Sequence, residues 1–342
     1  MQYAVVFGGK SYEHEISIVS TIAIKDIIPG AIFIFLDGNR DFYLIEKADL
    51  KSNYFSSGNY KKSPKLELKK GGFYQKSLLK EKKIPADVVI NLVHGADGED
   101  GKLASLLEFF EIDYIGPRIE GSVISYSKLL TKLYAKECGI EVLPYQLLRK
   151  QDKKIIDFEY PVIIKPNHLG SSIGVSVVYD SSELEYALDV AFEFDDEVLI
   201  EPFIEGIEEY NLAGAKGQTF HFSKIEAVKK EKLLDFEKKY LDFGRSGEVK
   251  DASLNETLRL HIRNAFEKIY DPLFSGAIIR IDFFVRDGKL YLNEINPVPG
   301  SLANYLFGDF RAVLEDVAKH LPKSKNIVID YRYINSIQSA KK

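Results

Sequence analysis

Residues 280–300, with the sequence RIDFFVRDGKLYLNEINPVPG, predict two strands of a hairpin joined by a short turn that contains Asp287 and Gly288. Side chains alternate between the two faces of a strand, so Arg280 and Asp282 share one face of the first strand. For the same reason, Glu294 and Asn296 share one face of the second strand. Asp, Glu and Asn supply the oxygen ligands that Mg²⁺ takes when it also binds nucleotide phosphates. A solvated strand face would show the same pattern, because Asp and Glu are common at exposed positions.

The length of the turn decides whether these side chains meet. A two-residue turn pairs Arg286 with Lys289 and puts the acidic residues of the two strands on opposite faces. A three-residue turn pairs Val285 with Lys289 and brings all four polar side chains to one side. The metal-site hypothesis requires the three-residue turn, and this is the turn that we predict.

The loop after the second strand, residues 297–301, has the sequence PVPGS. Two prolines and a glycine after a polar strand end predict a rigid loop that presents backbone N–H groups to an oxyanion. This loop therefore favours a ligand site over a solvated strand face.

Two other loops have the composition of anion-binding sites. Lys165 ends a short β-branched strand, and residues 170–174 form a Gly/Ser loop whose amides and hydroxyl groups could enclose phosphates. Loops of this kind are also common as plain surface turns. Residues 8–11, GGKS, suggest a Walker A loop, but that motif requires glycine where the chain has Ala4. We reject the P-loop and keep residues 8–11 as a loop that can hold an anion at the start of a helix.

Residues 94–101, HGADGEDG, follow a predicted strand at its carboxyl end, where open α/β sheets bind ligands. Their acidic residues do not match the spacing of an EF-hand calcium loop. His94 is a candidate substrate contact, although an isolated histidine is more often structural than catalytic.

Strand-like apolar runs alternate with helix-like segments over the first 120 residues, which predicts a parallel sheet with crossover helices. Residues 51–83 interrupt this pattern and predict a surface hairpin or a long excursion. The pattern changes near Gly116-Pro117. The predicted strands span residues 3–7, 31–36, 86–92, 161–166, 198–201, 209–214, 221–229, 277–285 and 289–296. The predicted helices span residues 15–28, 103–111, 127–138 and 254–270, and a charged loop spans residues 230–250.

Length and composition limit the class of protein. A chain of 342 residues is too long for one ordinary core and predicts two or three compact units. The hydrophobic content of 45% and charged content of 28% indicate a globular protein. The net charge of −5 argues against non-specific binding to nucleic acid or to anionic membranes. A single cysteine, no signal-peptide pattern and no apolar run of membrane length predict a soluble cytoplasmic protein.

Taken in order along the chain, these motifs resemble those of the D-alanine–D-alanine ligase family of ATP-grasp enzymes. The resemblance runs from residue 3 to about residue 310. Its segments are modest alone and specific in combination. They are residues 8–17 (GGKSYEHEIS), 94–101 (HGADGEDG), 165–172 (KPNHLGSS), 237–240 (EKKY), and 280–282 (RID) with 293–296 (NEIN).

The resemblance implies a three-domain ATP-grasp architecture of α/β and α+β units. The domains would be an N-terminal parallel-sheet domain (residues 1–118), a central ATP-grasp subdomain (119–205) and a C-terminal ATP-grasp subdomain with a mobile loop and the metal site (206–342). The implied activity is ATP-dependent ligation of two D-alanines through an acyl phosphate, giving ADP and phosphate, for peptidoglycan precursor synthesis. Mg²⁺ or Mn²⁺ and a homodimer are implied as well.

The resemblance also assigns residues by position. Those matching the phosphate, adenine and ribose contacts of ATP are Lys128, Lys165, Lys239, Glu201, Ile204 and Glu208, where a one-residue gap would move the ribose carboxylate to Glu209. Those matching the metal ligands are Asp282, Glu294 and Asn296. Those matching a hydrogen-bonded trio that orients substrate and joins the mobile loop are Glu13, Ser171 and Tyr240. The groups that hold the transferred carboxylate's oxygen match Arg280 and the Gly300 amide, and further substrate contacts fall on His94 and Ser301.

The loop after Asn296 departs from the family pattern. The family usually has Asn-Thr-x-Pro-Gly-x-Thr there, followed by a serine that contacts the second substrate. This chain has Pro297 in place of the first threonine, and Tyr305 falls where the serine is expected. Apart from Ser301, the pocket for the second substrate is therefore left without assigned residues.

Other functions fit the sequence less well. Another ATP-grasp ligase would share Lys165 and the metal ligands but should lack the trio of Glu13, Ser171 and Tyr240. A regulatory nucleotide-binding module is disfavoured because degenerate members usually lose the metal ligands. No G-x-G-x-x-G motif opens the first helix, which disfavours a dehydrogenase. The Tyr240 position resembles the dipeptide-forming members, and residues 230–250 are expected to close as a lid that excludes water.

Overall fold

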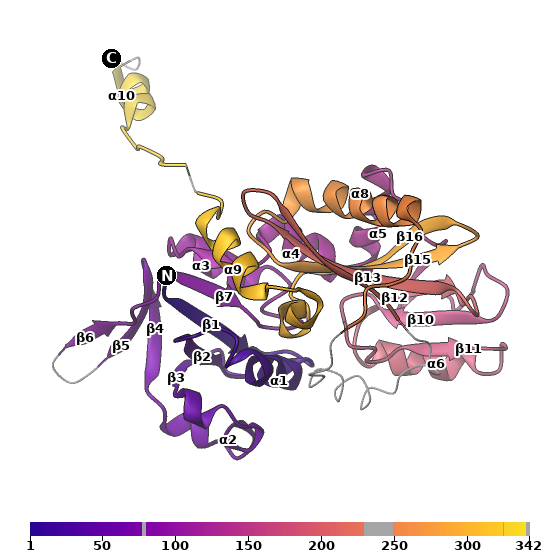
Figure 1. Ribbon diagram of the computed structural model, residues 1–342, viewed down its shortest axis with the longest axis horizontal. Helices are drawn as coiled ribbons and strands as arrows, with labels where there is room; N and C mark the ends of the chain where they lie inside the picture. Colours follow the sequence, from indigo (N-terminus) through magenta and orange to yellow (C-terminus); the bar gives the residue numbers. More distant parts are fainter. Residues whose placement is uncertain (77–79, 229–248, 324, 340–342) are drawn as a thin grey trace.

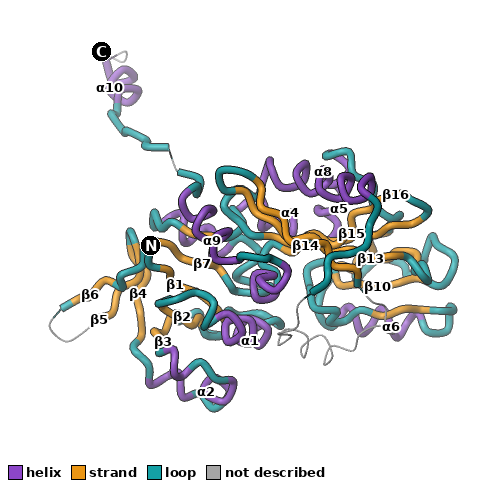
Figure 2. The backbone as a smooth tube through the Cα atoms, viewed as in Figure 1, coloured by secondary structure: helices purple, strands orange, loops and turns teal. Residues whose placement is uncertain are grey.

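A computed structural model of the protein describes residues 1–76, 80–228, 249–323 and 325–339 (Figure 1). Its framework is one sheet of eight strands and two sheets of four strands. Figure 2 shows the two smaller sheets between helices α8 and α6, which lie on opposite outer sides.

The eight-stranded sheet has the order β6-β5-β4-β3-β2-β1-β7-β8. Its strands β1, β2, β7 and β8 run parallel, which confirms the predicted parallel sheet. The predicted hairpin within residues 51–83 is present as β4 and β5, and it extends this sheet in antiparallel fashion. The strands are β1 (Tyr3–Gly8), β2 (Ile32–Leu36), β3 (Phe42–Ile45), β4 (Lys65–Lys69), β5 (Gly72–Lys76), β6 (Glu81–Lys83), β7 (Val88–Asn91) and β8 (Tyr114–Ile115).

Strand β1 is buried on both faces, which explains its continuous apolar sequence. The face that carries Phe7 packs against α1 (His14–Ile24) and α9 (Phe310–Lys319). The face that carries Val6 packs against α3 (Lys102–Phe109). A helix near the end of the chain therefore covers the sheet formed by its beginning.

The central sheet has the order β11-β10-β12-β9. Its apolar face, with Ile164 and Ile200, packs against α6 (Leu184–Phe192). Its other face carries Lys165 and Glu201, because these residues pair with neighbours one position away from the apolar rows. The strands are β9 (Gln146–Arg149), β10 (Val162–Pro166), β11 (Ser176–Val178) and β12 (Glu197–Pro202).

The third sheet has the order β14-β13-β15-β16 and is built in the same way. Leu212, Ile281 and Ile295 pack against α8 (Glu256–Leu273), which leaves a polar face on the opposite side. The strands are β13 (Glu208–Lys216), β14 (Phe220–Ala227), β15 (Ile279–Arg286) and β16 (Lys289–Asn296). Each of the two smaller sheets thus has one face covered by a helix and one polar face.

The predicted helices are confirmed as α1, α3, α5 and α8, and Gly139 ends α5 with φ of 72° as its C′ residue. Figure 1 places α10 away from the other elements, at the end of an extended segment. No helix within the described residues is both long enough and apolar enough to span a membrane. The bounds of α5 are Lys128–Glu137 and those of α10 are Arg332–Ser339. The remaining elements are α2 (Ser52–Ser56), α4 (Ile119–Tyr126), η1 (Lys47–Asp49), η2 (Asn59–Lys62) and η3 (Gly300–Leu306).

Candidate active site

The β15-β16 hairpin carries the predicted metal ligands. Its turn contains two residues, Asp287 and Gly288, with φ of 51° and 73°, as in the type I′ turn that Asp-Gly favours. Arg286 pairs with Lys289, so the predicted three-residue turn is wrong. The Asp-Gly pair adopts positive φ at both positions, and this twist matches that of the two strands.

A β-bulge brings the polar side chains together instead. Phe283 pairs with Leu292 whereas Asp282 pairs with Glu294, so Asn293 is an extra residue in the second strand. The extra residue reverses the alternation on β16. The predicted shared face for all four polar side chains is therefore confirmed, although by a different route.

Asp282 is held in place by its neighbours on this face. The Nε and Nη2 atoms of Arg280 each donate to one carboxylate oxygen of Asp282, at 2.7 Å. Asn296 Nδ2 donates to Asp282 Oδ2 at 3.1 Å. Burial raises the pKa of Asp282; Arg280 acts to lower this pKa, whereas Glu294 raises it further.

A divalent cation fits this face. Asp282 and Glu294 are neighbouring carboxylates whose negative charges disfavour each other, and a bound dication would favour their ionised forms. The described residues contain no group of three or more His, Cys, Asp or Glu that could hold a metal. Asn296 lies beside Asp282, and its amide oxygen would be the third protein ligand, as the sequence resemblance implies. A set of oxygen ligands alone suits Mg²⁺ or Mn²⁺.

The central sheet contributes a buried cluster of three charges. Lys165 Nζ lies 2.6 Å from Glu201 Oε2, and Lys132 from α5 forms a second ion pair with Glu201. The side chains of Glu201 and Lys132 are each 2% exposed. Burial alone would raise the pKa of Glu201, but the ammonium groups of Lys165 and Lys132 lower it to about 2. Sequence reasoning missed Lys132, because a lysine within a helix gives no sign of burial.

The polar faces of the two smaller sheets lie within electrostatic reach of each other. Burial acts to lower the pKa of Lys165, but Glu201 raises it, with further contributions from Glu294 and Glu209 on the third sheet. Burial lowers the pKa of Lys128; Glu294 acts in the opposite direction, and Lys165 lowers the pKa further. Lys128 and Lys165, two predicted phosphate-binding residues, thus lie within electrostatic reach of Glu294, a predicted metal ligand.

The predicted contact between Glu13 and Ser171 is present, with Ser171 Oγ donating to Glu13 Oε1 at 2.5 Å. Burial raises the pKa of Glu13, whereas this hydrogen bond and Lys128 lower it. Tyr240, the third member of the predicted trio, and Lys239 lie outside the described residues.

Glycines on two sides give Glu13 its space. A Cβ atom on Gly95 would lie 2.8 Å from Glu13 Oε2, and one on Gly170 would lie 2.9 Å from Glu13 Oε1. Gly95 also has φ of 68°, a conformation that favours glycine. The motif glycines therefore allow two loops to close around one carboxylate.

Replacement of Gly170 by alanine is expected to reduce, about tenfold or more, the enzymatic activity that the sequence resemblance implies, because the added methyl group displaces Glu13. Gly38→Ala is the control. No atom lies within 4 Å of the Cβ that this substitution adds, and the backbone of Gly38 is not in the left-handed region. Steady-state rates and thermal unfolding measure both variants. Equal activity of the two would contradict the role of Glu13.

The loop at residues 8–11 binds a carboxylate of the protein itself, the side chain of Asp97. The backbone N–H of Lys10 donates to Asp97 Oδ2 at 2.9 Å, and Arg40 pairs with the same carboxylate at 3.0 Å. Asp97 belongs to the loop that follows His94. The carboxylate therefore fastens two N-terminal loops to each other.

His94 is buried beside α1 rather than in contact with the charges described above. Its Nδ1 lies 3.1 Å from the carbonyl oxygen of Leu92, and its Nε2 lies 3.4 Å from Ser20 Oγ. Burial lowers the pKa of His94 to about 4. These contacts support the structural interpretation, and a substrate contact for His94 stays a prediction.

Acid is expected to destabilise the protein through His94. Between about pH 6.5 and 4 the unfolded state binds a proton that the folded state excludes, so the free energy of unfolding falls as pH falls. The expected loss is about 3 kcal/mol at most. Urea unfolding at several pH values should show a weaker pH dependence for His94→Gln, with His320→Gln as a surface control. Identical pH profiles for wild type and His94→Gln would contradict this.

The loop after β16 has an unusual backbone. Ser301, Leu302 and Ala303 have φ of 51°, 53° and 50°, a left-handed run directly after Gly300. Ser301 is buried, and its Oγ has no hydrogen-bond partner among the described residues. Such left-handed runs of non-glycine residues gather at ligand-binding segments. The observation supports the predicted substrate role of this loop.

Tyr305, at the expected serine position, lies beside Arg280. Burial raises the pKa of Tyr305, and the guanidinium of Arg280 acts to lower it. The side chain therefore adjoins the residue that is expected to hold the reacting carboxylate. Tyr305, the residue at which this loop departs from the family pattern, therefore lies next to a residue of the candidate site.

Comparisons with known proteins agree with this geometry. The family model described as "D-ala D-ala ligase N-terminus" matches residues 2–117, and "D-ala D-ala ligase C-terminus" matches residues 134–309. The chain belongs to the D-alanine–D-alanine ligase family. A relative from Wolinella succinogenes, named "D-alanine--D-alanine ligase", is 58% identical over 343 residues, covering 100% of this chain and 99% of the relative.

Solved structures show the same relationship. The crystal structure of the D-alanine–D-alanine ligase from Helicobacter pylori superimposes with a TM-score of 0.85 at 52% identity, covering 95% of this chain and all of that one. The VanG D-Ala:D-Ser ligase from Enterococcus faecalis has a TM-score of 0.73 at 22% identity, which shows a shared fold. The ATP-grasp architecture of this ligase-family chain is therefore confirmed.

The register bears on the choice between Glu208 and Glu209 as the predicted ribose contact. Glu209 pairs with Phe284 and Asn211 pairs with Asp282, so Glu209 lies on the polar face of the third sheet. Glu208 lies on the opposite face, exposed, with its carboxylate beside Tyr210. The register therefore favours the Glu209 alternative, and the ribose contact of this ligase-family chain stays a prediction.

Two further features complete the site. Ile204 is half-buried in the segment that joins β12 to β13, and so lies between the two smaller sheets. Asn211 is buried next to Asp282 on the polar face, and sequence reasoning missed it. Strand alternation from Glu209 would have placed Asn211 on this face.

Proposed function

We propose that this protein joins two D-alanine molecules in an ATP-dependent reaction that supplies a dipeptide for peptidoglycan synthesis. The observation that carries the proposal is the polar face of each smaller sheet: Lys165 lies beside Glu201 on the central sheet, and Asp282, Glu294 and Asn296 share one face of the third sheet. Cations suited to phosphates beside carboxylates suited to a metal form a site for a nucleotide triphosphate.

The chemistry follows from the weakness of a carboxylate as an electrophile. Transfer of the γ-phosphoryl group to the carboxylate of one D-alanine would give an acyl phosphate and ADP. The amine of the second D-alanine would attack the acyl carbon, and loss of phosphate and a proton would complete the peptide bond. The acyl phosphate hydrolyses in water, so the site must exclude solvent.

Different residues of the site would bind the phosphates, the adenosine and the metal ion. Lys128 and Lys165 would hold the phosphates of ATP, with Glu201, Ile204 and Glu209 around the adenosine. Asp282, Glu294 and Asn296 would hold Mg²⁺ or Mn²⁺, which neutralises charge during phosphoryl transfer.

The remaining groups would act on the amino acids. Arg280 and the Gly300 amide would stabilise the oxyanion, for which removal of one donor costs about 10²–10³ in rate. Glu13 and Ser171 would orient the first D-alanine, while Ser301 and His94 are assigned to substrate. Lys239 and Tyr240 would complete the site from the adjoining loop.

The test is ADP release with ATP, Mg²⁺ and D-alanine, beside L-alanine and D-lactate. We expect ADP release only with D-alanine, with D-alanyl-D-alanine detected by mass spectrometry in equal amount. ATP binding without D-alanine-dependent ADP release would reject the substrate and leave only an ATP-grasp assignment.

We also propose that the protein acts in the cytoplasm as a homodimer. The support for both statements is the family resemblance, since ATP and the peptidoglycan precursors of the family are cytoplasmic. Light scattering coupled to size-exclusion chromatography tests the dimer, and a mass near 38.8 kDa, that of one chain, would contradict it.

A further inference from the structure

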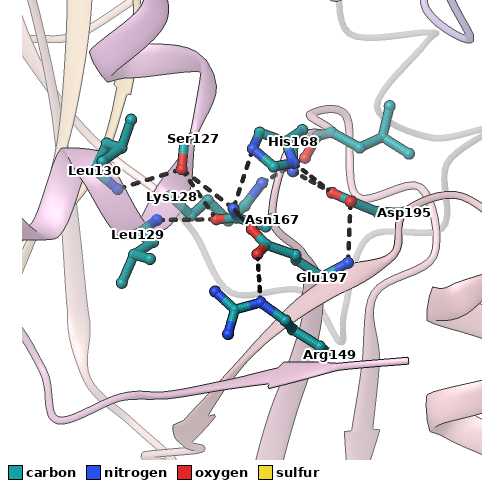
Figure 3. Close-up of polar contacts among 10 residues, drawn as sticks. Ser127, Lys128, Leu129, Leu130, Arg149, Asn167, His168, Asp195 and Glu197 are labelled. Atoms are coloured by element: carbon teal, nitrogen blue, oxygen red, sulfur yellow. Dashed lines mark hydrogen bonds and ion pairs between the residues drawn. The ribbon is translucent and has the colours of Figure 1, made fainter. Parts of the chain in front are cut away.

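The first turn of α5 is tied to the end of β10 by a buried hydrogen-bond network (Figure 3). Helix α5 begins at Lys128, and Ser127 is its N-cap, with Oγ accepting from the N–H of Leu130 at 3.3 Å. Asn167 lies on the other side of this junction, two residues after Lys165. The network therefore joins the two chain segments that carry the phosphate-binding lysines.

Asn167 uses its backbone and side chain on both segments. Its carbonyl oxygen accepts from the N–H of Lys128 at 3.0 Å, and its Oδ1 accepts from the N–H of Leu129 at 2.9 Å. Its Nδ2 lies 3.1 Å from Ser127 Oγ and 3.1 Å from Glu197 Oε2. The first two N–H groups of α5, which lack partners within the helix, are thus satisfied by one residue.

The other contacts of the network fix Asn167 itself. It is 1% exposed, and its N–H donates to the carbonyl oxygen of Glu197 on β12 at 2.9 Å. Glu197 is in turn held by Arg149 on β9 at 3.0 Å. Asn167 is therefore anchored to the central sheet, and α5 is anchored to Asn167.

We propose that Asn167 is a positioning residue that sets the separation of Lys128 and Lys165 for binding the phosphates of ATP. The inference rests on the proposed function, which gives those lysines their role. Lys165 lies on β10, two residues before Asn167, and the main-chain N–H of Lys128 donates directly to the Asn167 carbonyl oxygen. Loss of the Asn167 side chain keeps the backbone bond to Lys128 but removes the bonds to Leu129 and Ser127, which loosens the first turn of α5 and shifts the Lys128 ammonium relative to that of Lys165.

The test compares ADP with adenosine, because only ADP has the phosphates that the lysines contact. Isothermal titration of Asn167→Leu should show ADP binding weakened about tenfold, as expected for the loss of one or two buried hydrogen bonds, with adenosine binding unchanged. Equal weakening of both ligands, or of neither, would overturn the proposal. Ser127→Ala removes a smaller part of the network and should give a smaller loss in the same direction, which keeps the test valid if Asn167→Leu does not fold.

Four further variants separate the possible causes. Asn255 caps α8 through the N–H of Leu258 at 2.8 Å, so Asn255→Leu removes an exposed asparagine cap from another helix and should leave the ADP-to-adenosine ratio unchanged. Lys128→Met tests the proposed function separately, since unchanged ADP binding in this variant would remove the role of Lys128. In a Lys128→Met background Asn167→Leu should have no further effect on ADP binding, and an additional tenfold loss would reject positioning through Lys128.

The double variant Asn167→Asp with Glu197→Gln keeps the hydrogen bond between these two side chains but exchanges its donor and acceptor. We expect this variant to bind ADP as tightly as the wild type does.

Discussion

Replacement of Asp282 by asparagine is expected to slow D-alanine-dependent ADP release about a thousandfold. The substitution keeps the size of the side chain but removes one of two neighbouring carboxylates on the proposed metal face. It also removes the charged partner of Arg280, which now donates two hydrogen bonds to Asp282. Rates measured over a range of Mg²⁺ concentrations should show both a lower maximum and a higher requirement for the metal.

Asp287→Asn is the matched control for this prediction. Asp287 lies in the turn of the same hairpin, its side chain is 88% exposed, and asparagine suits a type I′ turn equally well. We expect this variant to keep wild-type activity. An Asp282→Asn variant that retains more than about a tenth of the wild-type rate would exclude Asp282 as an essential metal ligand.

Replacement of Glu201 by leucine is expected to lower the free energy of unfolding by about 3–5 kcal/mol. Glu201 is the only described anion that forms ion pairs with both Lys165 and Lys132. Its removal leaves two ammonium groups near each other, one of them almost fully buried. Urea unfolding followed by circular dichroism measures the loss.

The double variant Glu201→Leu with Lys132→Met is the control. Removing both buried charges replaces an ion pair by apolar volume, which typically costs little. We expect it to recover more than half of the stability lost in Glu201→Leu. A double variant as unstable as the single one would show that packing, and not charge, dominates at this position.

The same pair predicts a dependence on pH. The pKa of Glu201 is about 2 in the folded protein, below the value of 4.5 for an ordinary glutamate. Its stabilising contribution is therefore complete above about pH 4.5 and is lost as pH falls toward 2. Unfolding midpoints across this window should fall more steeply for wild type than for the double variant.

The hairpin shows both the reach and the limit of sequence reasoning. Alternation of side chains correctly paired Arg280 with Asp282 and Glu294 with Asn296 on each strand. The turn chemistry of Asp-Gly points to a type I′ turn, yet the requirement for a shared face led us to predict a longer one. The bulge at Asn293 has no signature in the sequence, because an asparagine on a strand reads the same with or without an extra register position.

The sequence left Glu209 as an alternative to Glu208 and gave no sign of Lys132, for different reasons. Alternation from Asn211 along β13 distinguishes Glu209 from Glu208, but only once the pairing with Asp282 is known. Lys132 is a lysine in an amphipathic helix, which normally indicates solvent. Its burial depends on Glu201, a residue 69 positions away that pairs with it only in the fold.

The packing of α9 on the first sheet affects how the chain can be made. Residues 3–91 leave the ribosome long before Phe310–Lys319, so the face of β1 that carries Phe7 has no partner from α9 during most of synthesis. The first sheet to emerge is thus the last to be fully covered. A chain that stops short of residue 310 would keep this apolar face open to other chains and would tend to aggregate.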